Sequence, residues 1–274
     1  MKTVYFDTNV YRHIYTLEDG ITKEDILKLK ALIRADKIRI LASIEVVEET
    51  ISAIISVPKE AVQRLKLIHK LAKRKRMIKH HTEFIQAVHA YANGGKVHSP
   101  FSSPPLLMRK FLTTPNLDDL EQIARETQEQ IQEHHDKMAD IYKTKIEPLA
   151  APVRQQRQQP TFADYWNTMA TPYLEELARQ AEVLEKCQAR GLNGLLAIRC
   201  LHIHTLGQVS LNYANTYTGR TPKRSDSRDM HHVLVSSAAE AFITNDAPLR
   251  RVMNRMPVEG YEALSFKEMM AKIQ

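Results

Sequence analysis

Two short apolar runs near opposite ends of the chain each lead into an aspartate that is accompanied by threonine and asparagine. Residues 4–6 (Val-Tyr-Phe) precede residues 7–9 (Asp-Thr-Asn), and residues 241–243 (Ala-Phe-Ile) precede residues 244–246 (Thr-Asn-Asp). Runs that are rich in β-branched and aromatic residues predict buried strands. Open α/β sheets bind their ligands at the carboxyl ends of such strands. We therefore expect the two aspartates to contribute to one acidic site.

Strand and helix patterns alternate in both terminal regions. From the N-terminus we expect a strand at 2–6, a helix at 23–35, a strand at 37–42 and a helix that Ser43 caps and that runs to about residue 56. Toward the C-terminus we expect a helix at 227–240, a strand at 241–244, a short helix at 248–253, a strand at 261–264 and a terminal helix capped by Ser265. This order predicts an α/β fold with a central parallel sheet flanked by helices.

The middle of the chain, residues 57–216, has the pattern of a large all-helical insertion without a strand. Two segments repeat apolar residues in steps of three and four, which is typical of helices that pack side by side. The first repeat contains Leu117, Leu120, Ala124, Ile131, Met138 and Ile141, and the second contains Trp166, Met169, Tyr173, Leu177, Leu184 and Cys187. Prolines separate the two, so we expect a long antiparallel helical hairpin. A helix at 195–211 is apolar around much of its surface and is expected to lie buried between this hairpin and the sheet. The predicted domains are an α/β domain of residues 1–56 plus 217–274, and the insertion.

Composition restricts the class of protein and its partners. The chain has 274 residues, a formal net charge of +7 and 43% hydrophobic residues. No stretch reaches the roughly 20 apolar residues of a membrane helix and no signal peptide is visible, so we expect no membrane association. Cys187 and Cys200 stand apart without metal-binding spacing, which favours a cytoplasmic location and buried thiols. A basic excess around an acidic site indicates a polyanionic partner, with nucleic acid as the leading candidate.

Positive charge is concentrated in two segments. One lies between residues 64 and 79 without an intervening acid, and the other is a Gly-, Pro- and Ser-containing loop at 219–228. The candidate nucleic-acid contacts are Lys73, Arg74, Lys75, Arg76, Lys223, Arg224 and Arg228. For the first segment, a solvated helix face explains the charges as well as a phosphate-binding surface does.

The predicted helix after Ser43 contains three glutamates. Its apolar stripe consists of Ile44, Val47, Ile51, Ile54 and Ile55. At about 100° per residue, Glu48 falls at the edge of this stripe, whereas Glu45 and Glu49 point further toward solvent. A carboxylate at the edge of a core is costly unless it is paired, hydrogen-bonded or bound to a cation. Glu48 is therefore the candidate site residue, although capping of a neighbouring group explains it equally well when it is considered alone.

Two aspartates begin the last predicted helix before the second acidic strand. Asp226 suits the N-cap position, and Asp229 lies in the first turn, where a negative charge stabilises the helix dipole. The helix after Asp229 leads directly into the strand that ends before Asp246. Because a helix N-terminus and a strand C-terminus in consecutive elements can meet at one sheet edge, Asp229 is also a candidate site residue.

Together these segments resemble the PIN domain of metal-dependent ribonucleases. The resemblance consists of the motif at Asp7, Glu48 five residues after Ser43, Asp229 with His232 at the start of a small-residue helix, and the closing motif at Asp246. It covers the two terminal regions, and the long helical middle departs from compact members of the family. The resemblance implies a Rossmann-like three-layer arrangement of sheet and helices.

The resemblance also implies a role for each matched residue. The implied ligands of Mg²⁺ or Mn²⁺ are Asp7, Glu48, Asp229 and Asp246, with Asp226 as a further candidate. Asn9 and Thr244 would support this site or position a water molecule. The chemistry agrees, because hard dications take carboxylate oxygens and four clustered carboxylates repel one another without a cation. The implied activity is endonucleolytic hydrolysis of RNA, and single-stranded DNA is a further candidate substrate.

The sequence also allows two other functions. A PIN-like protein that binds nucleic acid or acts as a scaffold without cleavage has the same pattern, since a fold alone does not establish activity. A haloacid-dehalogenase-like phosphatase begins with a strand and an aspartate as well, but it needs a second aspartate two residues later, where this chain has Asn9. The partners that the helical middle suggests are a protein inhibitor such as the antitoxin of a toxin, or a second copy of the chain.

Overall fold

The computed structural model describes residues 1–72, 77–103, 112–113, 115, 117–141, 144, 159–218, 220, 223 and 225–273. Five predicted nucleic-acid contacts lie outside these residues, namely Lys73, Arg74, Lys75, Arg76 and Arg224. Within the described part of the chain, every helix is too short or too polar to cross a bilayer.

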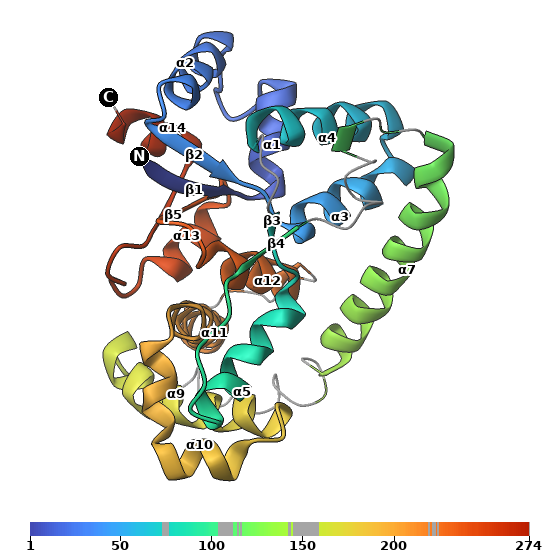
Figure 1. Ribbon diagram of the computed structural model, residues 1–274. Helices are drawn as coiled ribbons and strands as arrows, with labels where there is room; N and C mark the ends of the chain where they lie inside the picture. The colour runs from blue at the N-terminus through green and yellow to red at the C-terminus, as the bar shows by residue number, and fades with distance from the viewer. Residues whose placement is uncertain are drawn as a thin grey trace.

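In the described residues, four strands form a parallel sheet that joins the two terminal regions (Figure 1). The strands are β1 (Lys2–Phe6), β2 (Ile38–Leu41), β5 (Ala241–Ile243) and β6 (Glu262–Leu264), in the order β2-β1-β5-β6. Val4 of β1 pairs with Ile40 on one side and with Ala241 on the other. The predicted α/β fold with a central parallel sheet is confirmed.

The direction in which strands are added reverses between β1 and β5. The chain passes from β1 to β2 on one side of the sheet and from β5 to β6 on the other. The backbone N–H of Asp7 donates to the carbonyl of Ile243 at 2.9 Å, so the carboxyl ends of β1 and β5 are adjacent. Ligands of open α/β sheets bind in the crevice at such a reversal. Both acidic motifs therefore begin where this topology favours a binding site.

Helices cover both faces of the sheet. The helices that contact it include α1 (Thr8–Thr16), α2 (Lys23–Arg34), α12 (Asp226–Ser236), α13 (Ala247–Met253) and α14 (Phe266–Lys272). On one face, the Tyr5 hydroxyl lies 2.6 Å from Nδ1 of His232 on α12. The ring centroid of Phe6 lies 5.6 Å from that of Tyr11 on α1 and 6.3 Å from that of Phe266 on α14. Since successive side chains of a strand point to opposite faces, α12 and α14 lie on opposite faces of the sheet.

The remaining elements connect β2 to β5. The first group is α3 (Ile44–Ser52), η1 (Ala53–Ile55), α4 (Pro58–Ala72), β3 (Met77–Ile78), η2 (His81–Ile85), α5 (Gln86–Ala92) and β4 (Phe101–Ser102). The second group is α7 (Leu117–Ile141), α9 (Phe162–Gln180), α10 (Leu184–Arg190), η4 (Leu192–Ala197) and α11 (Arg199–Tyr217). Helix α11 is buried around most of its surface and packs against α9, α12 and α13, as its apolar pattern predicts.

Helices α7 and α9, which were expected to form a hairpin, pack against different parts of the molecule (Figure 1). Helix α7 lies along α3 and η1, and its Leu120 and Ala124 are buried. Helix α9 packs against α11, where Trp166 and Leu206 belong to one hydrophobic cluster. Over the described residues the predicted antiparallel hairpin is therefore wrong, because α7 packs against α3 and η1 whereas α9 packs against α11.

The middle region contains a short antiparallel ribbon, β3 with β4, where no strand was expected. The backbone N–H of Ile78 donates to the carbonyl of Ala42 at 2.9 Å, and Ile78 bridges to Ser43. The ribbon thus adjoins the end of β2 and brings the residues after β3 to the start of α3. Strands of two residues leave too short an apolar pattern to be recognised in a sequence.

One hydrophobic core connects the sheet to the predicted insertion. Val4 and Phe242 of the sheet belong to the same cluster of buried residues as Leu174 of α9 and Leu201 of α11. Cys187 and Cys200 are free and buried, as predicted. The division of the chain into two domains stays a prediction.

Candidate metal centre

Asp7 is held at the end of β1 by two polar side chains. Only 4% of the residue is exposed. The hydroxyl of Thr244 donates to its Oδ2 at 2.9 Å, and the amide of Asn9 donates to the same oxygen at 3.4 Å. Thr244 also accepts the backbone N–H of Asp246 at 3.2 Å. Asn9 and Thr244, the two residues expected to support the acidic site, therefore orient the carboxylate of Asp7.

The second carboxylate beside Asp7 belongs to Glu49 of α3. Nε2 of His232 lies 2.9 Å from Oε2 of Glu49 and 3.9 Å from Oδ1 of Asp7. Ligand atoms of these three residues all lie within 4.8 Å of one another. The Thr8 hydroxyl donates to Oε2 of Glu49, and Arg228 pairs with Oε1 at 3.1 Å. Asp7, Glu49 and His232, here called the sheet-edge group, therefore lie together at the carboxyl end of β1.

His232 is oriented by contacts that connect three elements of the fold. The Tyr5 hydroxyl lies 2.6 Å from its Nδ1 and 2.9 Å from the hydroxyl of Ser43. Ser43 is the N-cap of α3 and accepts the backbone N–H of Val46 at 3.2 Å. Strand β1 and the first turn of α3 thus hold the imidazole so that Nε2 is directed at Glu49.

Glu48, the glutamate predicted for the acidic site, does not join the sheet-edge group. Its Oε2 lies 3.5 Å from Nε2 of His80, and 39% of its side chain is exposed. Glu45 is buried and accepts a hydrogen bond from the backbone N–H of His81. The assignment of Glu45 and Glu49 to the solvent side of the helix is therefore wrong, and Glu49 is the glutamate beside Asp7.

The error comes from the width of the buried face of α3. Val46 and Thr50 are both fully buried, with 0% exposure, although they lie outside the apolar stripe on which the prediction rests. At about 100° per residue, they place Glu49 at the opposite edge of the buried face. The signal that could have identified Glu49 was Val46, an apolar residue left out of the stripe.

Asp246 and Asp226 are engaged in different ways. Oδ1 of Asp246 accepts the backbone N–H of Leu249 and caps α13, while Oδ2 lies 3.6 Å from Nζ of Lys223. Asp226 begins α12 instead of capping it, and the guanidinium of Arg220 contacts both of its carboxylate oxygens. The charge of Asp226 is thus already balanced by an arginine, which leaves it the weakest candidate among the predicted metal ligands.

Negative charge is poorly compensated at Asp229. Burial and the charge of Asp7, with smaller contributions from Asp226 and Asp246, raise the pKa of Asp229 to about 7, although His232 acts in the opposite direction. Burial also raises the pKa of Asp7. Asp229 and Asp246 therefore belong to the same charge network as Asp7. Carboxylates that raise one another's pKa suit a site that holds a dication.

His232 carries the balancing positive charge. Burial alone lowers its pKa, but the charge of Glu49 and the hydrogen bond to it outweigh this effect and raise the pKa to about 9. The imidazole is therefore protonated at neutral pH, and its charge offsets part of the repulsion between the carboxylates.

The raised pKa of His232 predicts how the stability of the metal-free protein depends on pH. The interaction of protonated His232 with Glu49 stabilises the fold fully below the ordinary histidine pKa of 6.5. This stabilisation is lost as the pH rises through about 9 and the imidazole loses its proton. In EDTA, we expect the free energy of unfolding to fall by up to about 3 kcal/mol across this range. Urea unfolding of the wild type and of His232→Gln measures it, and the fall should be smaller in the variant. Equal pH dependence in the two proteins would show that His232 does not carry the effect.

Two predicted nucleic-acid contacts lie at this edge of the sheet. Arg228 pairs with Glu49, and Lys223, half of whose side chain is exposed, approaches Asp246. Positive charge therefore lies directly beside the carboxylates. Such an arrangement suits a substrate phosphate that approaches a metal-bearing acidic site.

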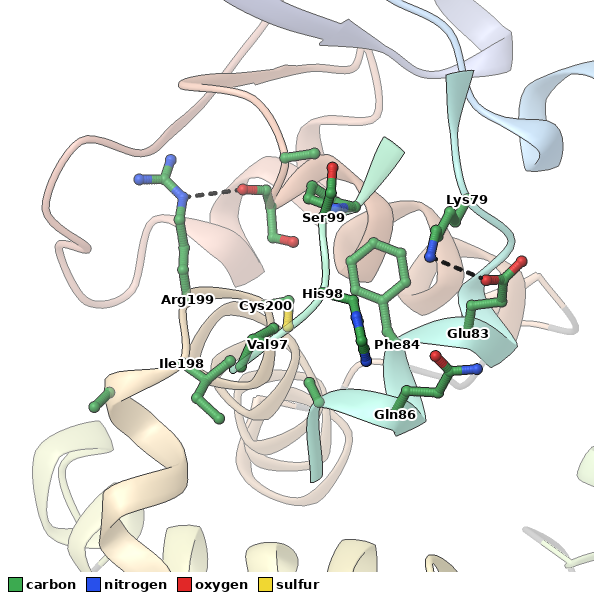
Figure 2. Close-up of a pocket in the computed structure, with 15 residues that line it drawn as sticks. Lys79, Glu83, Phe84, Gln86, Val97, His98, Ser99, Ile198, Arg199 and Cys200 are labelled. Carbon is green, nitrogen blue, oxygen red and sulfur yellow. Dashed lines mark hydrogen bonds and ion pairs between the residues drawn. The ribbon is translucent and has the colours of Figure 1, made fainter. Parts of the chain in front are cut away.

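A separate cavity of about 370 Å³ lies between η2 and the start of α11 (Figure 2). Of its charged residues, Lys79 pairs with Glu83 at 3.3 Å, and Nε of Arg199 donates to the carbonyl of Ser237 at 3.0 Å. These side chains are engaged by the protein itself. The positive groups of Lys79 and Arg199 in the cavity thus have partners within the protein, whereas the carboxylates at the sheet edge repel one another.

Comparisons of the chain with protein families, with curated proteins and with solved structures found no match. The arrangement of residues at the sheet edge therefore carries the functional inference.

Proposed function

We propose that the protein is a metal-dependent endoribonuclease of PIN type, with its site at the carboxyl ends of β1 and β5. One observation carries the proposal, namely the convergence of Asp7 and Glu49 at the reversal of strand order. The electrostatic coupling of Asp229 to Asp7 and Asp246 adds to it. Glu49 takes the role that the sequence pattern suggested for Glu48.

The chemistry of the donor set fits Mg²⁺ or Mn²⁺. Asp7, Glu49, Asp229 and Asp246 would hold the ion, because hard dications prefer carboxylate oxygens and retain some of their water. Burial and the charge of Asp7 raise the pKa of Asp229, and a bound dication would offset both the desolvation of the carboxylate and the repulsion. When bound, the ion supplies a water molecule activated for attack on a phosphodiester and a positive charge beside the leaving oxygen.

The neighbouring side chains prepare this site. Thr244 and Asn9 fix the carboxylate of Asp7. Tyr5 holds the ring of His232 at Nδ1, and Nε2 of the same ring fixes the position of Glu49. The substrate enters from the exposed side, where Lys223 offers a cation for a phosphate. Catalysis of this kind depends mainly on positioning and on charge stabilisation.

The two alternative functions make different demands on the same residues. A haloacid-dehalogenase-like phosphatase needs a carboxylate at position 9, but this position holds Asn9, whose amide donates to Asp7. A protein that binds nucleic acid without cleaving it needs the positive charge beside the site and not the convergence of acids. The convergence therefore favours the nuclease.

The test is cleavage of single-stranded RNA by the full chain with Mg²⁺, with Mn²⁺ and with EDTA. We expect cleavage with either metal, no cleavage in EDTA, and products that carry 5′-phosphate and 3′-hydroxyl ends. Cleavage that EDTA does not affect would contradict the metal mechanism. RNA that binds but stays intact with every metal would favour the binding or scaffold function, and a matched DNA strand tests the preference for RNA.

A further inference from the structure

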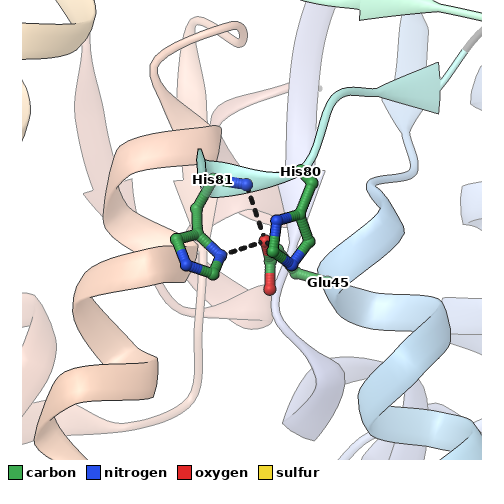
Figure 3. Close-up of side chains that lie close together, drawn as sticks. All are labelled: Glu45, His80 and His81. Carbon is green, nitrogen blue, oxygen red and sulfur yellow. Dashed lines mark hydrogen bonds and ion pairs between the residues drawn. The ribbon is translucent and has the colours of Figure 1, made fainter. Parts of the chain in front are cut away.

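A second group of metal-binding side chains lies beside the start of α3 (Figure 3). It consists of Glu45 on α3 and of His80 and His81, which follow β3, and we call it the histidine group. Their ligand atoms lie within 4.8 Å of one another. The bridge between Ile78 and Ser43 brings the two histidines to the helix.

His80 presents Nε2 to two carboxylates at once. This nitrogen lies 3.5 Å from Oε1 of Glu45 and 3.5 Å from Oε2 of Glu48. Both distances exceed the about 2.9 Å of an ordinary hydrogen bond. The other ring nitrogen, Nδ1, lies 2.8 Å from the hydroxyl of Thr82, and the backbone N–H of Thr82 approaches it at 3.4 Å. In metal sites, a hydrogen bond at one nitrogen of a histidine orients the other nitrogen toward the metal, and the contact with Thr82 does this for Nε2.

His81 approaches the same oxygen of Glu45. Its Nδ1 lies 2.7 Å from Oε1, and its backbone N–H donates to this oxygen at 2.8 Å. The imidazole stacks on that of His231, with 3.5 Å between ring centroids and 10° between planes. The stacking fixes the ring without using Nδ1. Two imidazole nitrogens therefore converge on one carboxylate oxygen (Figure 3).

The spacing of these atoms suits a tetrahedral metal ion. Ligands at the Zn–N and Zn–O distances of about 2.0–2.1 Å are about 3.3 Å apart. The 3.5 Å between His80 and Glu45 is already close to this value. The 2.7 Å hydrogen bond between His81 and Glu45 has to widen by roughly half an ångström, and the ion then replaces the proton between them.

We propose that Glu45, His80 and His81 bind a late first-row transition-metal dication, with Zn²⁺ as the preferred ion. Two imidazoles and one carboxylate are a donor set that suits Zn²⁺, whereas Mg²⁺ prefers oxygen ligands alone. Three protein ligands leave a fourth position for water or for Glu48. The proposal concerns a site other than the sheet-edge group and does not depend on the proposed nuclease activity.

The experiment titrates the full, metal-free chain with Co²⁺, a spectroscopic substitute for Zn²⁺, and follows visible absorption and displacement by Zn²⁺. We expect one tetrahedral Co²⁺ ion per chain, and the same spectrum in Asp7→Asn, which alters only the sheet-edge group. The double variant His80→Gln with His81→Gln should weaken Co²⁺ binding by more than about 100-fold. Even the loss of a residue that only hydrogen-bonds to a metal ligand typically lowers metal affinity 10–100-fold. The matched control replaces the exposed His69 and His89 by glutamine and should bind as the wild type does.

The single variant His80→Gln keeps the test valid if the double variant is unstable. It leaves the hydrogen bond between His81 and Glu45 in place, and its unfolding in EDTA shows whether the fold persists. A folded His80→Gln chain that binds Co²⁺ as tightly as the wild type would overturn the proposal. Absence of tetrahedral Co²⁺ in the wild type, or its loss in Asp7→Asn alone, would also overturn it. Failure of RNA cleavage would not, because the readout is metal binding.

Discussion

Asp7→Asn is expected to lower the rate of metal-dependent RNA cleavage by at least about 100-fold. Mutation of a residue that only hydrogen-bonds to a metal ligand typically costs 10–100-fold in activity, and loss of a ligand itself should cost more. The substitution removes the charge of the buried carboxylate at the reversal of strand order. Asparagine has the same shape, and its amide oxygen can still accept the hydroxyl of Thr244. The fold should therefore persist, and the loss should appear in initial rates at saturating Mg²⁺.

Asp36→Asn is the matched control for this substitution. Asp36 is exposed and has a φ of 51°, a left-handed conformation that asparagine adopts readily. It should cleave RNA at the rate of the wild type. Cleavage by a folded Asp7→Asn protein at that same rate would exclude Asp7 as a metal ligand and would contradict the proposed mechanism.

The second large effect separates two neighbouring glutamates of α3. Glu49→Gln is expected to lower cleavage by at least about 100-fold, on the same reasoning as for Asp7, because Glu49 lies beside Asp7 through their shared partner His232. Glu48→Gln is expected to retain most of the activity in Mg²⁺, because Glu48 faces His80. The comparison decides between the helix face inferred from the sequence and the face seen in the fold.

Both variants are assayed with the same RNA, and their unfolding midpoints are measured at the pH of the assay. Removal of the Glu49 charge also leaves His232 without its main partner, so Glu49→Gln should unfold at lower urea concentration. Glu24→Gln, an exposed change on α2, serves as the control. If Glu48→Gln were the inactive variant and Glu49→Gln the active one, the assignment of Glu49 would be wrong.

The sheet and the helices α2, α12, α13 and α14 could be predicted because local signals agree with the fold, whereas α1 was not expected. The apolar runs of β1 and β5, the N-cap residues Ser43 and Ser265, and the alternation of strand and helix all indicate the same topology. Asp7 could be identified because a polar residue that directly follows a buried strand must lie at the sheet edge. Its contact with Thr244 follows from the adjacency of the two strands.

The rest depends on tertiary packing that a periodic pattern does not reveal. Both edges of the buried face of α3 carry glutamates, and the direction from which α12 approaches decides which of them meets Asp7. Helices α7 and α9 were expected to pair with each other, yet α7 packs against α3 and η1, and α9 packs against α11. The histidine group arises because a two-residue strand brings His80 and His81 to α3 from far along the chain, and no local signal marks this contact.

Binding of a dication by Asp7 and Glu49 is the point on which the proposed function depends most. It is tested most directly by anomalous diffraction from a crystal of the protein soaked in Mn²⁺. We predict an anomalous peak bonded to carboxylate oxygens of both Asp7 and Glu49, with Glu48 outside its coordination. A soaked crystal in which no manganese lies within bonding distance of Asp7 would contradict the assignment of this sheet edge as a metal centre.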